Sequence, residues 1–193
     1  MMLSKSGAVP AESGGGRTKS ESEMRDEIQE SRSNGAVLGR ILRSFGSYYD
    51  VRTEGAFHPF DAEAEFHSHD EQFVLVRSAR ISETESNEYA FFRSLPSLDE
   101  QTLKFLCESA WREGLSRVRP HFSHRNSDVA LVVVADKVEE GAFALARRMS
   151  FSKSYFFLLK GWSDFRLAVI ESSTGRTSSN RRGRDLAASI SKQ

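Results

Sequence analysis

A chain of 193 residues can hold one ordinary domain with tails, because a single hydrophobic core usually takes about 100–150 residues. The net charge is zero, with 27 basic and 27 acidic residues, and the single cysteine, Cys107, excludes an intramolecular disulfide and a cysteine-rich metal site. No apolar run approaches the roughly 18–20 residues that span a bilayer, and the N-terminus has no segment of signal-peptide type. We therefore expect a cytoplasmic protein.

Both ends of the chain read as tails. Residues 1–33 are rich in Ser, Gly and charge and contain few large apolar side chains, so they cannot bury enough surface to offset their ordering entropy and are predicted to be disordered. Residues 173–193 have a similar, basic composition and are predicted to be flexible, although Leu186 and Ile190 could let a last short helix dock. The folded domain is predicted over residues 34–172.

The first half of this domain reads as a helix followed by strands. Asn34 can cap a helix whose apolar residues recur at spacings of three and four up to Phe45, with Gly46 at its end. Strands are then predicted over residues 48–53, 62–68, 73–81 and 88–92, and together they form a meander. Residues 62–68 alternate in period two, which is typical of a half-exposed antiparallel strand.

The second half alternates helices and strands. Ser97 and Glu100 form a capping box before a helix with an apolar stripe from Leu103 to Trp111, and Gly114 weakens its last turn. Residues 129–135 are seven consecutive apolar residues, the pattern of a strand covered on both faces. Asp136 is then predicted to cap a second helix, and strands over 155–159 and 165–170 close the domain. This order predicts an α/β (α+β) fold: a mixed, mostly antiparallel sheet around a buried central strand, with about three helices packed on it.

Candidate chemistry is sparse. The sequence has no glycine-rich phosphate loop, nucleophile elbow, dinucleotide fingerprint or two-histidine metalloprotease helix, which favours a role other than catalysis. Strand periodicity places Glu63, Glu65, His67 and His69 on one face, and carboxylates with imidazoles can bind a divalent metal. The same alternation is also what the solvated face of a half-exposed strand shows. We expect no cofactor other than a metal ion at this site.

Basic residues are concentrated in the second half. Residues 1–95 carry 11 Lys and Arg against 16 Asp and Glu, whereas residues 96–193 carry 16 against 11. The candidates for contact with an anion or a nucleic acid are Arg117, Arg119, His121, His124, Arg125, Arg147 and Arg148. An ordinary solvated loop, and a helix C-terminus that favours Arg147 and Arg148, explain the same residues without any ligand and are the simpler interpretation.

Two resemblances follow from these segments. The sequences Phe73-Val-Leu-Val, 87–92 and 161–169 are similar to those of a small uncharacterised prokaryotic domain family, which implies a bacterial or archaeal origin. The element order over about residues 36–136 resembles the restriction-endonuclease-like core, in which an acidic residue on the second core strand and a Glu-x-Lys pair on the third bind magnesium. Asp61 or Glu63 matches the first position, but residues 73–80 have neither the glutamate nor the lysine, so the metal site would be incomplete.

Three hypotheses for the function remain open. The first is a non-catalytic module that binds a protein or a nucleic acid through its basic second half. The second is a divergent metal-dependent hydrolase or nuclease that uses Glu63, Glu65, His67 and His69. The third is a structural or oligomeric protein whose residues 155–159 form an edge that pairs with a second chain.

Overall fold

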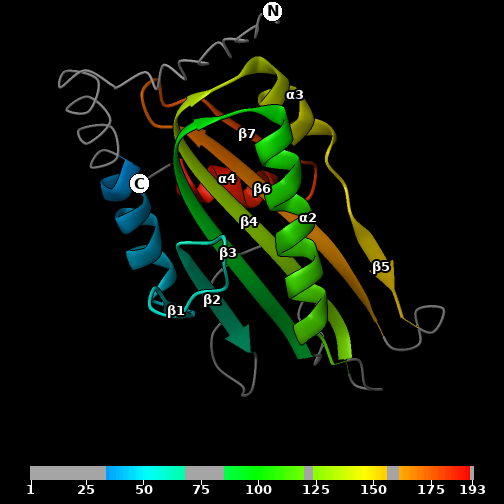
Figure 1. Ribbon diagram of the computed structural model, residues 1–193. Coiled ribbons are helices and arrows are strands. Elements are labelled where there is room, and N and C mark those ends of the chain that lie inside the picture. The colour runs from blue at the N-terminus through cyan, green and yellow to red at the C-terminus, as the bar shows by residue number, and fades with distance from the viewer. Residues whose placement is uncertain (1–33, 68–84, 120–123, 156–160, 192–193) are drawn as a thin grey trace, which may run out of the picture.

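A computed structural model describes residues 34–67, 85–119, 124–155 and 161–191 (Figure 1). The predicted tail over residues 1–33 and the predicted strand over 73–81 lie outside this part of the chain. Residues 34–45 form the first described helix, here called the 34–45 helix. The elements that follow it are β1 Asp50–Arg52, β2 Ala62–His67, β3 Glu85–Leu98, α2 Glu100–Arg117, β4 His124–Val138, α3 Glu140–Arg148, β5 Ser152–Ser154, β6 Trp162–Glu171, β7 Thr177–Ser179 and α4 Arg184–Ile190.

The seven described strands form one mixed sheet in the order β1-β2-β3-β4-β6-β5, with β7 also paired to β6. The three long central strands, β3, β4 and β6, run parallel to one another. The short strands β1, β2, β5 and β7 are all antiparallel to their neighbours. The predicted α/β fold with a mixed sheet is therefore confirmed.

Each face of the sheet is covered by two helices, because side chains along a strand point alternately to its two sides. Val129, Leu131 and Val133 of β4 lie in the apolar cluster beneath α2 and α3. The intervening residues Ala130 and Val132 lie in a second cluster beneath the 34–45 helix and α4. Figure 1 shows α2 in front of the sheet and α4 behind it. Strand β4 is buried on both faces, as its apolar run predicts.

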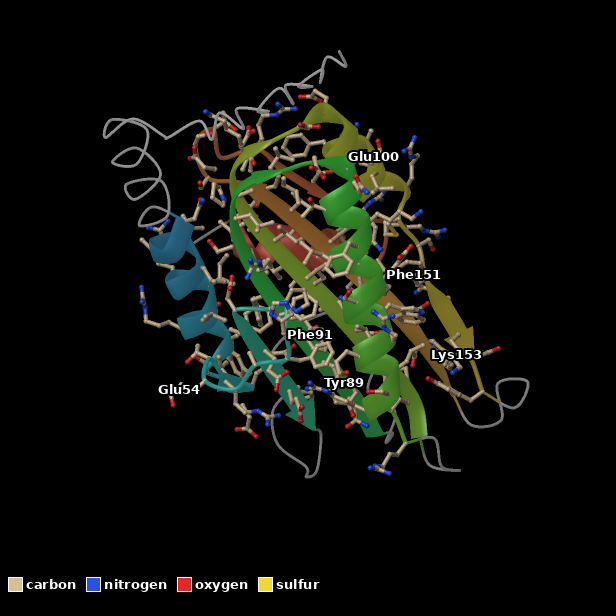
Figure 2. The ribbon with its side chains drawn as sticks, viewed as in Figure 1. Glu54, Tyr89, Phe91, Glu100, Phe151 and Lys153 are labelled. Atoms are coloured by element: carbon tan, nitrogen blue, oxygen red, sulfur yellow. The ribbon has the colours of Figure 1, made fainter. Side chains whose placement is uncertain are left out.

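Large aromatic side chains fill the cluster beneath α2. Figure 2 shows Tyr89 and Phe91 of β3 on the face of the sheet that α2 crosses. The rings of Trp111 from α2 and Phe151 stack with their centroids 5.7 Å apart. Cys107 lies in the same apolar layer, where burial raises the pKa of its thiol. A buried, protonated thiol is a poor nucleophile.

Helices α2 and α3 begin later in the chain than predicted. The strand before each helix continues past its apolar residues into the polar residues that were expected to cap the helix. Ser97 still pairs with Lys137 inside the sheet, so the cap of α2 is Asp99, whose Oδ1 accepts from the backbone N–H of Thr102 at 2.6 Å. Asp136 was expected to cap the second helix, and this is wrong: it lies within β4. The cap of α3 is Glu139, which makes no side-chain capping bond.

The C-terminal segment also differs from the flexible tail expected over 173–193. Residues 177–179 pair with β6, and α4 places Leu186, Ala187 and Ile190 in the apolar cluster beneath the sheet. Asn180 anchors this segment from a buried position, since its side-chain amide bonds the backbone of Phe165 and Leu167 in β6. Leu186 and Ile190 dock this last short helix, as the sequence allowed, although the rest of the segment is polar.

Candidate functional site

Three acidic side chains form a row across the central parallel strands. Glu88 of β3 is the register partner of Asp128 in β4, and Asp128 is the partner of Asp164 in β6. All three lie near the amino-terminal ends of their strands and face the side that carries the 34–45 helix and α4. Neighbouring strands are only about 4.8 Å apart, so this register brings three carboxylates close together. We call these residues the acidic row.

Two arginines compensate the outer members of the acidic row. Nη1 of Arg166 donates to both carboxylate oxygens of Glu88 at 3.0 Å, and Tyr49 Oη donates to Glu88 Oε2 at 2.9 Å. Nη2 of Arg182 lies 3.2 Å from Oδ2 of Asp164. Each of these two carboxylates therefore has a cationic partner, as a buried acidic side chain requires.

The central member, Asp128, has the weakest compensation. Its only ion pair within the described residues is to Nη1 of Arg166 at 3.8 Å, which is too long for a hydrogen bond. Its side chain is 27% exposed. Burial and then the charge of Glu88 raise the pKa of Asp128 to about 6, although Arg166 opposes the shift. A carboxyl with such a pKa in a hollow is a typical functional-site residue.

The acidic row lies at the base of a pocket of about 1050 Å³ between the 34–45 helix and α4. One wall comes from the end of that helix and the turn after it, which contribute Tyr48 and Tyr49. The other wall comes from the segment around α4, which contributes Arg181 and Arg182. Trp162, at the start of β6, completes the lining; it is 37% exposed and Tyr48 is 53% exposed. The pocket thus combines carboxylates, aromatic rings and arginines.

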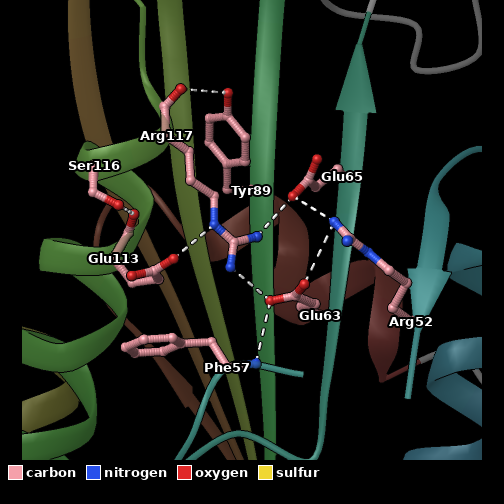
Figure 3. Close-up of polar contacts among 8 residues, drawn as sticks. All are labelled: Arg52, Phe57, Glu63, Glu65, Tyr89, Glu113, Ser116 and Arg117. Atoms are coloured by element: carbon pink, nitrogen blue, oxygen red, sulfur yellow. Dashed lines mark hydrogen bonds and ion pairs between the residues drawn. The ribbon is translucent and has the colours of Figure 1, made fainter. Parts of the chain in front are cut away.

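The predicted metal-binding face lies on the opposite side of the sheet and is engaged in ion pairs (Figure 3). Glu63 and Glu65 do share one face of β2, as their spacing predicts, but Arg117 of α2 lies between them. Its Nη2 is 2.8 Å from Glu63 Oε2, its Nη1 is 2.7 Å from Glu65 Oε1, and its Nε is 2.9 Å from Glu113 Oε1. Arg52 of β1 approaches the same two carboxylates from the other side.

This arrangement clamps the end of α2 to β2, the strand next to the edge strand β1. Glu63 is 4% exposed. Burial lowers the pKa of the Arg117 guanidinium, but the hydrogen bonds and charges of Glu63 and Glu113 outweigh this effect and raise it overall. No group of three His, Cys, Asp or Glu side chains in the described part of the chain could hold a metal ion. His69 and the side chain of His67 lie outside that part, so the metal site stays a prediction.

The structure does not bring the predicted basic residues together as one surface. Arg117 is committed to the carboxylates just described, and Arg148 lies 3.4 Å from Glu100. Arg119 and Arg147 are exposed. The other candidates lie outside the described residues: His121 and the side chains of His124 and Arg125. Contact with an anion or a nucleic acid through these residues also stays a prediction.

The acidic row was not predicted from the sequence, because none of its three members belongs to a recognisable motif within its own segment. A signal is nevertheless present: Glu88, Asp128 and Asp164 each stand at the entrance of an apolar strand. Parallel strands that each begin with an acidic residue can align these residues in a row. The alignment requires the strand order and register, which the local sequence does not contain.

The fold and the site define an α/β domain in which a mixed sheet, covered on both faces, carries a polar pocket on one of them. Residues 34–192 match the sequence model of a family described as a domain of unknown function (DUF8052), so the chain belongs to this family. No curated protein and no solved structure matches the chain. Among the described residues, no helix is both long and apolar enough to cross a membrane.

Proposed function

We propose that this protein is a non-catalytic binding module and that the pocket between the 34–45 helix and α4 is its binding site for a small molecule. The observation that carries the proposal is the acidic row at the base of a 1050 Å³ pocket with exposed aromatic residues. Sites for small molecules are hollows of about 300–1,000 Å³ that combine apolar walls with a few well-placed polar groups. The pocket is at the upper end of this size range, and its lining combines the aromatic side chains of Tyr48, Tyr49 and Trp162 with a larger share of charged groups than is usual.

The way the polar groups are held favours binding. Glu88 and Asp164 are fixed by Arg166 and Arg182, so the base of the pocket is ordered without a ligand. Pre-ordered polar groups lower the entropic cost of binding. The aromatic surface of Trp162 provides contact area next to these polar groups.

The test is a thermal-shift screen of the full chain against small molecules of positive, negative and zero charge. A ligand that binds the native state raises the melting temperature by an amount that grows with the logarithm of its concentration relative to its Kd. The hits should lose their effect in Trp162→Ala and keep it in Phe105→Ala, which removes an aromatic ring exposed on α2 away from the pocket. A screen in which no hit depends on Trp162 would contradict the proposal.

The nucleic-acid form of the binding hypothesis rests on a separate observation, the excess of five basic residues (16 against 11) in residues 96–193. Exposed Arg119 and Arg147 support it, because neither is paired with a carboxylate in the described part of the chain. Fluorescence anisotropy with DNA and RNA at two salt concentrations tests it, since phosphate contacts weaken steeply with salt. The absence of binding at low salt would exclude this form.

We further propose a cytoplasmic location in a bacterial or archaeal cell, supported by the resemblance of residues 87–92 and 161–169 to a prokaryotic family.

A further inference from the structure

We propose that the pocket selects a small organic cation with a flat apolar body, whose charged nitrogen meets Asp128 and whose body lies against Trp162. This inference rests on the proposed function and specifies the ligand of the same site. It follows from three features of the pocket: its charge balance, the free capacity of one carboxylate, and the spacing between that carboxylate and an exposed aromatic ring.

The charge balance of the pocket leaves an excess of negative charge. Its lining contains four acidic residues and three arginines. Two of the acidic residues form ion pairs that neutralise their charge: Glu88 with Arg166, and Asp164 with Arg182. The remaining charged groups are Asp128 and Asp185 against Arg181, which gives −2 + 1 = −1. A ligand with one positive charge therefore balances the pocket.

The carboxylate of Asp128 can accept further hydrogen bonds. Glu88 already accepts hydrogen bonds from Arg166 and Tyr49, whereas Asp128 accepts none from the described residues. Burial and the charge of Glu88 raise the pKa of Asp128, which shows that its ionised form is poorly stabilised. A bound ammonium, amidinium or guanidinium would supply the missing charge-assisted hydrogen bond.

The sheet register sets the distance between Asp128 and the aromatic surface. Trp162 pairs with Asn126, two residues before Asp128 on the same face of β4. Two residues along a strand and one step across it place the Cα atoms of Trp162 and Asp128 about 8 Å apart. A single planar ring with a cationic substituent has this reach. The ring can lie on Trp162, and the cation gains further stabilisation from aromatic faces such as that of Tyr48.

The arginines argue against an anion in the interior of the pocket. Arg166 and Arg182 are held by Glu88 and Asp164, so an anion would have to displace a carboxylate from each of them. Of the three arginines that line the pocket, only Arg181 has no ion pair within the described residues. Arg181 is exposed. A nucleotide, with a ring for Trp162 and a phosphate for Arg181, is the chemically closest competitor and belongs in the test.

The test compares three probes of nearly one shape: benzamidine, which is cationic, benzamide, which is neutral, and benzoate, which is anionic. Adenosine monophosphate serves as the nucleotide probe. The chain has two tryptophans, so Trp111→Phe leaves Trp162 as the only tryptophan and makes its fluorescence a local reporter of binding. Calorimetry on the unsubstituted chain checks that this reporter variant binds in the same way.

At pH 7.5 we expect benzamidine to bind at least about tenfold more tightly than benzamide or benzoate, as one charge-assisted hydrogen bond predicts. Asp128→Asn should reduce the affinity for benzamidine about tenfold and leave the weak affinity for benzamide unchanged. Asn has the shape of Asp, so the variant isolates the charge. Glu100→Gln, which removes an exposed carboxylate of α2 outside the pocket, should retain the preference for benzamidine.

Three results would overturn the inference: equal or tighter binding of benzamide, benzoate or adenosine monophosphate; a benzamidine affinity that Asp128→Asn leaves unchanged; and no benzamidine binding at up to about 10 mM. Each is distinguishable from failure of the proposed function. Binding of a neutral or anionic probe that quenches Trp162 would keep the pocket as a binding site and reject only the cation. A broad screen without any hit that depends on Trp162 would reject both.

Discussion

Gly114 of α2 lies directly against Val129 of β4. A Cβ atom at position 114 would be 2.5 Å from Val129 Cγ2 and 2.7 Å from Cγ1, well inside contact distance. The sequence predicts only that this glycine weakens the last turn of the helix. The structure gives its purpose, because the missing side chain lets α2 approach the buried central strand closely.

Replacement of this glycine should therefore destabilise the protein. Gly114→Ala gains about 1 kcal/mol in helix propensity, but the clash with a β-branched core side chain costs about 1–3 kcal/mol, so a net loss is expected. Urea unfolding measures the difference in the free energy of unfolding. The matched control is Gly39→Ala in the 34–45 helix, where the nearest atom to a new Cβ is Arg43 Nη1 at 3.5 Å. This control should be stabilised; a stabilised Gly114→Ala would refute the packing argument.

The second prediction concerns Asn180, which ties the C-terminal segment to β6. Its Oδ1 accepts from the backbone N–H groups of Leu167 at 3.0 Å and Gly183 at 2.8 Å, and its Nδ2 donates to the carbonyl of Phe165 at 2.8 Å. Asn180→Ala leaves these buried groups without partners and should cost at least about 2 kcal/mol. The exposed residue Thr177 supplies the control, since Thr177→Ser should change the free energy of unfolding by less than about 0.5 kcal/mol.

Hydrogen exchange shows where the effect of Asn180→Ala acts. Amide protons of α4 should exchange faster in the variant, because loss of the anchor favours local opening of this segment. The hydrogen bonds of the Asn180 side chain go to Phe165, Leu167 and Gly183, so amide protons in β4 should exchange faster only by the amount that the global free energy of unfolding falls. Unchanged protection of α4 would show that the segment is held by Leu186 and its apolar neighbours alone.

The elements of the fold follow from sequence where hydrophobic patterns are strong. The apolar run 129–135 identifies the central strand, and the alternation of Ala62 to Glu65 identifies which residues of β2 share a face. The ends of the strands could not be predicted in the same way. Polar residues such as Ser127 and Asp128 continue the ladder because β3 and β6 supply register partners on both sides, and the local sequence does not identify these partners.

The candidate site depends on long-range relationships for the same reason. The partner of Glu63 is Arg117, which lies 54 residues away, and Arg166 reaches Glu88 across 78 residues. Its pocket is closed by segments at opposite ends of the described chain, around Tyr48 and around Arg182. A local motif search finds patterns within one segment, so it favoured the face of β2 and could not find a site assembled from three strands and two helices.

The third prediction addresses the arginine that clamps α2 to the sheet. Arg117→Met keeps much of the length of the side chain but leaves Glu63, only 4% exposed, without its main partner. Breaking a buried ion pair in this way should cost about 3–5 kcal/mol. Thermal and urea unfolding measure the loss, and Arg119→Met, at an exposed position nearby, is the control with an expected change below about 0.5 kcal/mol.

A second substitution separates the charge effect from simple loss of packing. Glu63→Gln in the Arg117→Met background removes a buried charge that only the exposed Arg52 would still compensate, so the double variant should regain part of the lost stability. The single variant Glu63→Gln should by contrast be destabilised, because it weakens the clamp in the unsubstituted chain. If the double variant is no more stable than Arg117→Met, packing of the guanidinium on Phe91, 5.3 Å from the ring centroid, is the larger contribution.

The fourth prediction is a pH dependence that belongs to Asp128. Its pKa rises from 3.8 to about 6 on folding, through burial and the charge of Glu88, against the opposing effects of Arg166 and Arg182. The folded state binds the proton more tightly, so the stabilisation from this group is complete below pH 3.8 and is lost as the pH rises through about 6. At pH 7 the ionised form is therefore a cost, at most about 3 kcal/mol, and Asp128→Asn should be more stable than the unsubstituted chain.

The measurement is the difference in the free energy of unfolding between the two proteins at several pH values. This difference should be largest at pH 7 and should shrink between pH 7 and 5, as Asp128 takes up its proton. The use of a difference cancels the titration of carboxylates that both proteins share. Glu100→Gln, at an exposed carboxylate outside the pocket, should show a difference from the unsubstituted chain that does not change over this range. A constant difference for Asp128→Asn, or one that grows as the pH falls, would show that the native state does not hold Asp128 at a raised pKa.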